Sequence, residues 1–232
     1  MNWFDVNILL FLNQFANHWR GFDFAITRAY STNLNGGVVM GLACLALFDP
    51  SKPGQLCKRS ELLLGAMLLS APATLFARAL ALSLPFRLRP LWTPALHFHS
   101  PQLASGSLVL LGWSAFPSDH ATLFFALATG IFFASRPLGL FAYAWVAALI
   151  SFPALYLGIH WPTDVIAGAC LGVSFACLAK LPFVSRAVGQ FTTKWHYQQP
   201  GLFFALLFLW SYEVANLFDD GRRLLSGIWH LI

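Results

Sequence analysis

The chain has 232 residues, of which 58% are hydrophobic and only 10% are charged. Soluble domains have roughly 45–50% apolar and about 25% charged residues, so this composition excludes an ordinary water-soluble globule and predicts an integral membrane protein. The formal net charge is +5, but no basic run is longer than a pair, which argues against nucleic acid as a partner. We interpret residues 1–232 as a single membrane-embedded domain.

The first residues lack the features of a cleavable signal peptide, since Asp5 precedes the apolar residues and no basic region comes first. Residues 3–19 place Trp3, Val6 and Leu10 at helical spacing, with polar residues between them. This pattern predicts an amphipathic helix that lies in the membrane interface.

Six apolar segments follow, and each is a candidate membrane span. The first has its apolar core at residues 36–48. That core is too short for a hydrocarbon layer of ~30 Å at ~1.5 Å per residue, so we expect the span to begin near Thr27. The other segments are residues 62–84, 118–133, 138–157, 165–181 and 202–217. The predicted fold is an all-α integral membrane protein, a bundle of six transmembrane helices preceded by the interfacial helix.

Residues 85–117 form the one long stretch between predicted spans, and its aromatic content favours an ordered, functional loop. The distribution of basic residues predicts the orientation of the bundle. Seven lie in the connections on one side: Lys52, Lys58, Arg59, Arg136, Lys180, Arg186 and Lys194. The opposite side has six, so the excess is small but places the first side in the cytoplasm. The long loop is then extracytoplasmic.

A histidine and a carboxylate, His160 and Asp164, lie four residues apart at the end of one span. Pro162 suits the first position of a helix, which puts Asp164 in the first helical turn. A carboxylate that accepts from one imidazole N–H fixes the tautomer, and the other nitrogen then presents its lone pair to an electrophile. Taken alone, the pair is more simply explained as a helix cap beside an interfacial histidine.

Two further polar clusters fall on the same side of the predicted membrane. The helix start at Ser118 offers backbone N–H groups to an anion, and His120 can protonate a leaving oxygen. Arg89 adds a guanidinium that matches phosphate oxygens. A solvated histidine and a snorkelling arginine are the simpler explanations of each cluster alone. Together with His160 and Asp164, the clusters predict one site.

The order of these clusters resembles the type 2 phosphatidic acid phosphatase (PAP2) family, which shares its core with vanadium haloperoxidases. The family pattern is K-x6-R-P, then P-S-G-H, then S-R-x5-H-x3-D. The matching residues are Arg89-Pro90, Pro117-Ser118-Asp119-His120, and His160 with Asp164. The resemblance covers about residues 60–180. The P-S-D-H variant is similar to the bacterial undecaprenyl diphosphate phosphatase branch.

The resemblance implies an enzyme of the cell membrane that hydrolyses undecaprenyl diphosphate to the monophosphate outside the cytoplasm and recycles this lipid carrier for cell wall biogenesis. His160 would form a phosphohistidine, Asp164 would orient it, and His120 would protonate the leaving group. Arg89 and Ser118 would hold the phosphate oxygens. No cofactor is expected, and the sequence has no cluster suited to Mg²⁺ or Zn²⁺. Another lipid phosphate as substrate, or phosphotransfer in place of hydrolysis, remains an alternative.

Two positions depart from the family pattern. Leu82 stands where the family has lysine, seven residues before Arg89, and Ala154 stands where it has arginine, six residues before His160. A single transition-state arginine can change the rate of phosphoryl transfer by ~10³–10⁵. Three interpretations follow: the protein is weakly active, it holds phosphate differently, or the alanine was introduced to disable it. An inactive protein that binds lipid phosphate is therefore the competing function.

Two other arginines are candidate replacements for the missing phosphate-binding cations. Arg78 lies one helical turn before Leu82, and Arg87 lies two residues before Arg89. Asp119, in place of the family's glycine, would repel phosphate when ionised. We therefore expect Asp119 to be protonated, turned away, or hydrogen-bonded to a substrate group or a basic side chain.

Overall fold

The computed structural model describes residues 2–47, 58–101 and 112–218, and in these ranges it contains helices and loops but no strand. The α-helices are α1 (Trp3–Asn13), α2 (Arg20–Ser31), α3 (Leu34–Leu47), α4 (Lys58–Ser83), α5 (Asp119–Ala134), α6 (Arg136–Trp145), α7 (Phe152–Tyr156), α8 (Pro162–Leu178), α9 (Pro182–Gln198) and α10 (Pro200–Ala215). The all-α prediction is confirmed for this part of the chain. Lys52 and the predicted loop around it lie outside the described residues.

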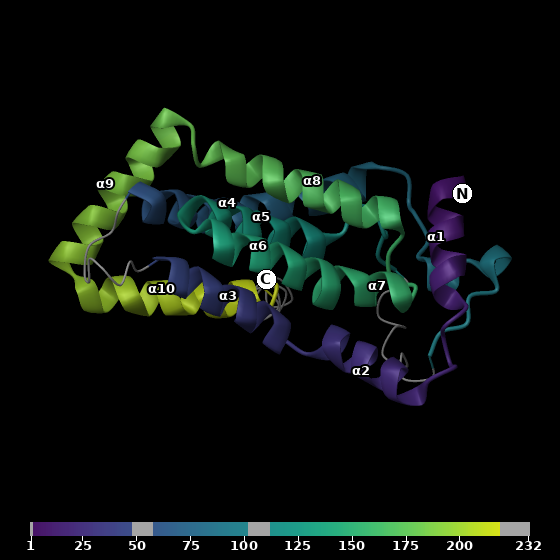
Figure 1. Ribbon diagram of the computed structural model, residues 1–232. Coiled ribbons are helices and arrows are strands. Elements are labelled where there is room, and N and C mark those ends of the chain that lie inside the picture. Colours follow the sequence, from purple (N-terminus) through teal and green to yellow (C-terminus); the bar gives the residue numbers. More distant parts are fainter. Residues whose placement is uncertain (1, 48–57, 102–111, 219–232) are drawn as a thin grey trace, which may run out of the picture.

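The long helices run along one axis, with α5 at the centre of the bundle. Figure 1 shows α1 across one end of the bundle and α9 along the other end. Helix α5 packs against α4, α8, α6 and α3. Its residues Leu123, Leu127 and Ile131 are fully buried, together with Leu63 and Met67 of α4. Apolar packing around α5 therefore fixes the ends of the helices that border it.

Helices α5 and α8 approach each other closely because α8 has glycine where they cross. A Cβ on Gly168 would collide with the carbonyl oxygen of Ser118, and one on Gly172 with that of Thr122. The close approach also brings the starts of the two helices together, since the Ser118 N–H donates to the carbonyl oxygen of Asp164 at 3.1 Å. The second and third polar clusters of the sequence are thus joined.

Two helices of the described chain are long and apolar enough to cross a membrane. They are Lys58–Ser83 and the continuous Arg136–Tyr156, in which a π-helical stretch, Val146–Ser151, joins α6 to α7. Helices α8 and α9 meet the same criteria as a pair, but the chain bends by 70° between them. Helices α1, α3, α5 and α10 are shorter apolar helices. These features support a membrane protein, and the six-span layout stays a prediction.

The N-terminal helix differs from the predicted amphipathic helix. It ends at Asn13, well before Trp19, and the face that packs on the protein carries Asp5, Leu9 and Asn13, while Trp3 is exposed. Polar groups can be buried there because the protein satisfies them. The Asn13 amide, for example, donates to the His99 carbonyl oxygen at 2.8 Å and accepts from the His99 N–H at 2.9 Å.

The expected first span does not begin near Thr27. Helix α2 ends at Ser31 and α3 starts at Leu34, so the polar residues between them form a turn. The Asn35 amide stabilises this turn, because it donates to the carbonyl oxygens of Ala29 at 2.5 Å and Leu149 at 3.1 Å. Helix α9 was also not predicted. The other five predicted segments correspond to α4, α5, α6 through α7, α8 and α10, with shifted ends.

Candidate active site

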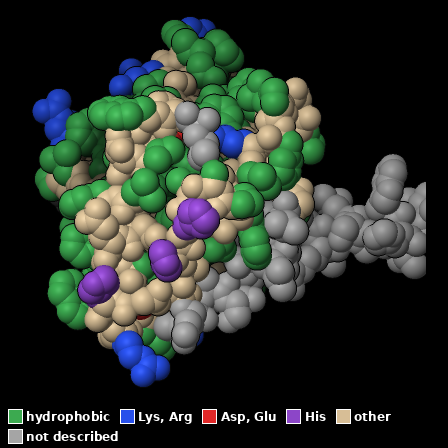
Figure 2. Space-filling model, turned by 90° about the vertical axis from the view of Figure 1, so that its right-hand side faces the viewer, with side chains coloured by type: hydrophobic (Ala, Val, Ile, Leu, Met, Phe, Trp, Pro, Cys, Tyr) green, Lys and Arg blue, Asp and Glu red, His purple; other side chains and the backbone are tan. Residues whose placement is uncertain are grey.

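The polar clusters meet at one end of the bundle, where α1 lies across it (Figure 1). The site is built from the start of α5, the start of α8, and the loop that follows α4. Figure 2 looks onto this end, where several histidine side chains reach the surface. The exposed histidines His18, His97 and His99 border a hollow between α1 and the loop. Within the described ranges no group of three or more His, Cys, Asp or Glu side chains is placed to hold a metal ion.

His160 is held in a tight turn between α7 and α8 and is only 5% exposed. The Ala154 carbonyl oxygen accepts from the Ile159 N–H at 2.9 Å and from the His160 N–H at 3.2 Å. Gly158 has φ of +69°, and a side chain at this position would also collide with the Phe98 ring. Glycine tolerates this left-handed conformation at little cost, so the turn depends on it.

The hydrogen bonds of His160 define its tautomer. Its Nδ1 lies 2.9 Å from the Ala115 carbonyl oxygen. A carbonyl can only accept, so Nδ1 carries the proton and the neutral ring keeps its lone pair on Nε2. Nη1 of Arg89 lies 3.4 Å from that Nε2. The nitrogen that keeps its lone pair therefore faces a guanidinium. The sequence did not identify Ala115, because a backbone carbonyl leaves no signature in residue type.

Asp164 caps α8 and lies next to His160. Its Oδ2 accepts from the Trp161 N–H at 2.8 Å, and Pro162 occupies the first helical turn as predicted. The same oxygen lies 3.6 Å from Nδ1 of His160, farther than the Ala115 carbonyl oxygen. Asp164 is thus close enough to stabilise a positive imidazole ring, while the direct hydrogen bond that orients the ring comes from Ala115.

Arg87 bonds to carboxylates through both of its terminal nitrogens. Nη1 donates to Oδ1 of Asp164 at 2.6 Å and to Oγ1 of Thr163 at 2.8 Å. Nη2 donates to Oδ2 of Asp5 at 2.6 Å. The sequence suggested Arg87 as a phosphate-binding cation. In this arrangement a phosphate would have to displace a carboxylate to reach it.

Arg89 is the buried cation that faces His160, with 6% of its surface exposed. Its Nη1 donates to the Ile159 carbonyl oxygen at 2.8 Å, and its Nε has no hydrogen-bond partner among the described residues. Burial lowers the pKa of the Arg89 guanidinium, because the charged form loses solvation, and the carboxylates of Asp164 and Asp119 oppose this. A bound anion would compensate for the lost solvation and accept from Nε.

Arg78 forms an ion pair with Asp119 at the first residue of α5. The guanidinium of Arg78 also lies 4.1 Å from the centre of the Trp113 ring. Of the arrangements expected for Asp119, the structure has the bond to a basic side chain. Ser118 precedes this residue as the N-cap of α5, with Oγ accepting from the Ala121 N–H at 3.4 Å.

The two positions that depart from the family pattern have opposite environments. Leu82 is 85% exposed and faces outward from α4. Ala154 is 3% exposed and lies under the turn that carries His160. Leu82 points away from the site, whereas Ala154 leaves a buried methyl group at the base of the turn that carries His160.

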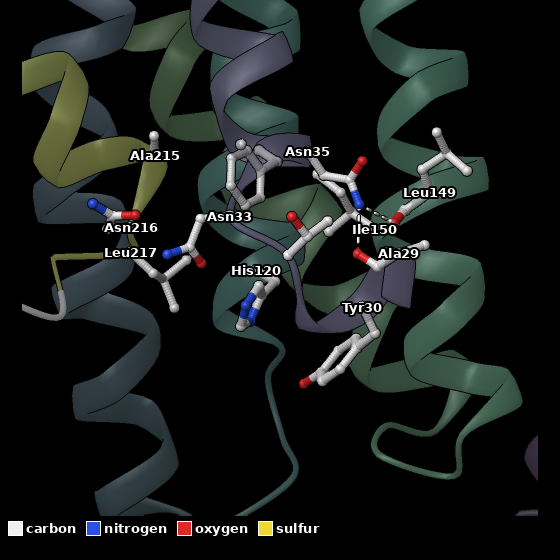
Figure 3. Close-up of a pocket in the computed structure, with 13 residues that line it drawn as sticks. Ala29, Tyr30, Asn33, Asn35, His120, Leu149, Ile150, Ala215, Asn216 and Leu217 are labelled. Carbon is white, nitrogen blue, oxygen red and sulfur yellow. Dashed lines mark hydrogen bonds between the residues drawn. The ribbon is translucent and has the colours of Figure 1, made fainter. Parts of the chain in front are cut away.

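His120 and Tyr30 line a pocket that the sequence did not reveal (Figure 3). Their ring centroids are 6.1 Å apart, and the side chains of Asn33 and Asn216 border the same pocket. Burial raises the pKa of the Tyr30 hydroxyl; the positive charge of Arg89 opposes this and the carboxylate of Asp119 adds to it. The hydroxyl therefore remains a neutral donor. Tyr30 belongs to α2, far from every motif, so no sequence signal pointed to it.

Comparison with known proteins agrees with this geometry. The profile of a family described as "PAP2 superfamily" matches residues 61–187, more than half of the chain. "Bacitracin transport permease protein BcrC" of Bacillus licheniformis is 33% identical over 85 residues, 34% of this chain and 40% of that protein. "Lipid A 4'-phosphatase" of Bacteroides thetaiotaomicron is 43% identical over 63 residues, 26% of this chain and 28% of that protein. The chain thus matches less than half the length of either relative. No solved structure matches.

Proposed function

The chain belongs to the PAP2 superfamily, and from this membership and the geometry of the site we propose that it is a membrane lipid phosphatase. The observation that carries the proposal is the pairing of His160 with Arg89. One nitrogen of the buried imidazole donates to a carbonyl oxygen, and the other, with its lone pair, faces a guanidinium 3.4 Å away. A neutral nucleophile is thereby fixed beside a cation that suits phosphate.

In the proposed reaction Nε2 of His160 attacks the terminal phosphorus, and a P–N bond forms as the bond between that phosphorus and the bridging oxygen breaks, with the lipid monophosphate as the leaving group. His120 gives its proton to the leaving oxygen, then takes one from the water that cleaves the phosphohistidine. Asp164 stabilises the positive ring of the intermediate. Arg89, Ser118 and the first N–H groups of α5 hold the phosphoryl oxygens. The proposed reaction uses no metal or cofactor.

The contacts suggest different tasks for the two replacement arginines. Arg78 already binds a carboxylate oxygen at the start of α5, and a phosphoryl oxygen can take its place. We therefore assign Arg78 to the phosphate, as the cation that replaces the one missing at Leu82. Arg87 is occupied by Asp5 and Asp164, and we assign it to the support of Asp164.

The substrate that we propose is a polyprenyl diphosphate such as undecaprenyl diphosphate, whose tail stays in the bilayer while the diphosphate reaches the helix ends. The P-S-D-H variant supports this choice. Lipid A phosphate is the second candidate, because one relative is named for that substrate. We place the site on the extracytoplasmic face of the cell membrane by the positive-inside rule.

The test is phosphate release in detergent from undecaprenyl diphosphate, phosphatidate, phosphatidylglycerophosphate and lipid A. The wild type should release phosphate with one preferred lipid, and His160→Ala should be at least about 10³-fold slower, since the nucleophile is lost. Equal release by the two proteins would overturn the proposal. Retained lipid binding by His160→Ala would show that the variant is folded.

A second candidate function is binding of lipid phosphate without turnover. The buried methyl group of Ala154 favours it, because the family pattern has an arginine at this position. Lipid binding without phosphate release, in the wild type and in Ala154→Arg alike, would support this function over hydrolysis.

A further inference from the structure

Helix α1 brings a buried carboxylate, Asp5, to the start of α8. The side chain of Asp5 is fully buried. Its Oδ2 accepts from Nη2 of Arg87 at 2.6 Å and from Oγ1 of Thr163 at 2.7 Å, and its Oδ1 accepts from the Thr163 N–H at 2.9 Å. An ionised carboxylate is strongly disfavoured in a buried position unless its oxygens are bonded, and here both are.

We propose that Asp5 is a positioning residue for the nucleophile, acting through Arg87 and Asp164 on His160. The proposal rests on the phosphatase function proposed above. It adds to the active centre a residue from an N-terminal helix that lies outside residues 61–187, the part of the chain that matches the family.

The hydrogen bonds connect Asp5 to the active centre in short steps. Arg87 lies between two carboxylates. Its Nη2 is 2.6 Å from Oδ2 of Asp5, and its Nη1 is 2.6 Å from Oδ1 of Asp164. Asp164 lies 3.6 Å from Nδ1 of His160. Asp5 therefore holds Arg87 away from the Arg89 side of the ring, where phosphate would bind.

Asp5 also completes the cap of α8. The first N–H groups of a helix have no partner within it. Asp164 accepts from the Trp161 N–H, and Asp5 accepts from the Thr163 N–H two residues later. Two carboxylates from distant parts of the sequence thus fix the start of α8, and with it the turn that carries His160.

The charges of this unit determine the expected effect of removing Asp5. Asp5, Arg87 and Asp164 together carry one net negative charge, and the loss of Asp5 leaves a neutral pair beside His160. Among the described residues Arg89 also faces the ring, with Nη1 at 3.4 Å from Nε2, and the carboxylate of Asp119 interacts electrostatically with Arg89. A less negative surrounding stabilises the positive imidazole ring of the proposed intermediate less well, so the reaction should be slower without Asp5.

The first experiment compares Asp5→Asn with Asp23→Asn. Asp23 is a matched control, because it is also a buried N-terminal carboxylate, and it accepts from the Asn17 N–H at 3.1 Å and the Tyr156 hydroxyl at 2.5 Å. Asp5→Asn should lower kcat by roughly 10- to 100-fold through misplacement of the nucleophile, with little change in KM. Asp23→Asn should lower only the Tm. Loss of kcat in strict proportion to the folded fraction, for both variants, would overturn the proposal.

The second experiment does not depend on activity. The NMR signal of the His160 ring can be recorded in detergent micelles at one fixed pH, with the signal assigned from its loss in His160→Ala. Asp5→Asn should change the chemical shift and broaden the signal, because the ring is less firmly positioned, whereas Asp23→Asn and the charge-conserving Asp5→Glu should leave the signal as in the wild type. Identical ring signals in the wild type and Asp5→Asn would overturn the proposal, even if the wild type released no phosphate and the proposed function had failed.

Arg87→Lys provides a second variant in case Asp5→Asn does not fold. Lysine keeps the positive charge but lacks the planar fork that bonds both carboxylates at once. The kcat of this variant should fall by a similar factor. Wild-type kcat in a folded Arg87→Lys protein would contradict the proposed role of the unit formed by Asp5, Arg87 and Asp164.

Discussion

The guanidinium of Arg78 is paired with the carboxylate of Asp119 at the start of α5. The start of a helix is a favourable position for a phosphate. Arg78 would help to bind the phosphate there, but it is paired with Asp119. The Arg78 side chain is 28% exposed, so solvent weakens the pair and a phosphate can compete for the arginine.

We therefore expect Asp119→Asn to bind phosphate more tightly than the wild type. The gain should be about 5-fold, which corresponds to ~1 kcal/mol, the upper range for a partly exposed ion pair. The measurement is the competitive inhibition constant of inorganic phosphate.

Arg78→Met should have the opposite effect on this constant, because the phosphate then loses a cation. An unchanged constant in Asp119→Asn would mean that Arg78 does not contact the phosphate.

Ala154→Arg should raise phosphatase activity. Position 154 is buried under the turn of His160, and an arginine there would add transition-state stabilisation of the kind that is worth up to ~10³–10⁵ in related chemistry. The cost is lower stability, because a larger side chain is forced into a packed region at roughly 1–3 kcal/mol. The expected result is at least a 10-fold higher kcat/KM together with a lower Tm.

Ala154→Met is the matched control for this gain, since methionine adds length without charge. It should lower the Tm without raising kcat/KM. Equal kcat/KM in Ala154→Arg and Ala154→Met would show that the protein needs no cation at this position.

Gly172→Ala should separate α5 from α8 and reduce both stability and activity. The new methyl group would collide with the Thr122 carbonyl oxygen, and backbone cannot move aside as a flexible side chain can. Overpacking of this kind costs roughly 1–3 kcal/mol. The shift would also move Ser118 away from Asp164, so activity should fall further than the Tm alone predicts.

Gly41→Ala is the comparison for this variant, because the space around Gly41 is open. Its Tm should stay equal or rise slightly, since alanine favours the helix by about 1 kcal/mol. Equal Tm values for the Gly172→Ala and Gly41→Ala proteins would contradict the close approach of α5 and α8.

The sequence predicted those parts of the structure that depend on local pattern. Apolar length located most of the helices, and proline followed by aspartate located the start of α8. The contacts of Arg87 could not be predicted, since its partner Asp5 is 82 residues away on a helix whose pattern suggested a membrane-facing role. Ala115 contacts His160 through its backbone carbonyl, which no residue type reveals. Tyr30 reaches the pocket of His120 only because α2 packs there, so no local sequence pattern indicated it.

Tyr30→Phe should lower kcat/KM by roughly 3- to 10-fold, because it removes a neutral hydroxyl that can donate to the leaving group in the pocket that His120 also lines. Burial raises the pKa of the Tyr30 hydroxyl, so this group should contribute no limb to a profile of activity recorded between about pH 5 and 9. The profiles of wild type and Tyr30→Phe should therefore have the same shape. A basic limb that disappears in the variant would show that Tyr30 titrates during catalysis.

The same shift in pKa predicts how stability depends on pH in the alkaline range. The unfolded chain releases the Tyr30 proton at its ordinary value near ~10, while the folded protein retains it, so the folded state binds more protons above that pH. The free energy of unfolding should then fall as the pH rises beyond ~10, and part of this fall should be absent in Tyr30→Phe. Melting curves at about pH 9 and 11 measure the difference, with Tyr197→Phe, at a 58% exposed site, as the control. The same loss of Tm between the two pH values in wild type, Tyr30→Phe and Tyr197→Phe would show that the phenol of Tyr30 is not held neutral by the fold.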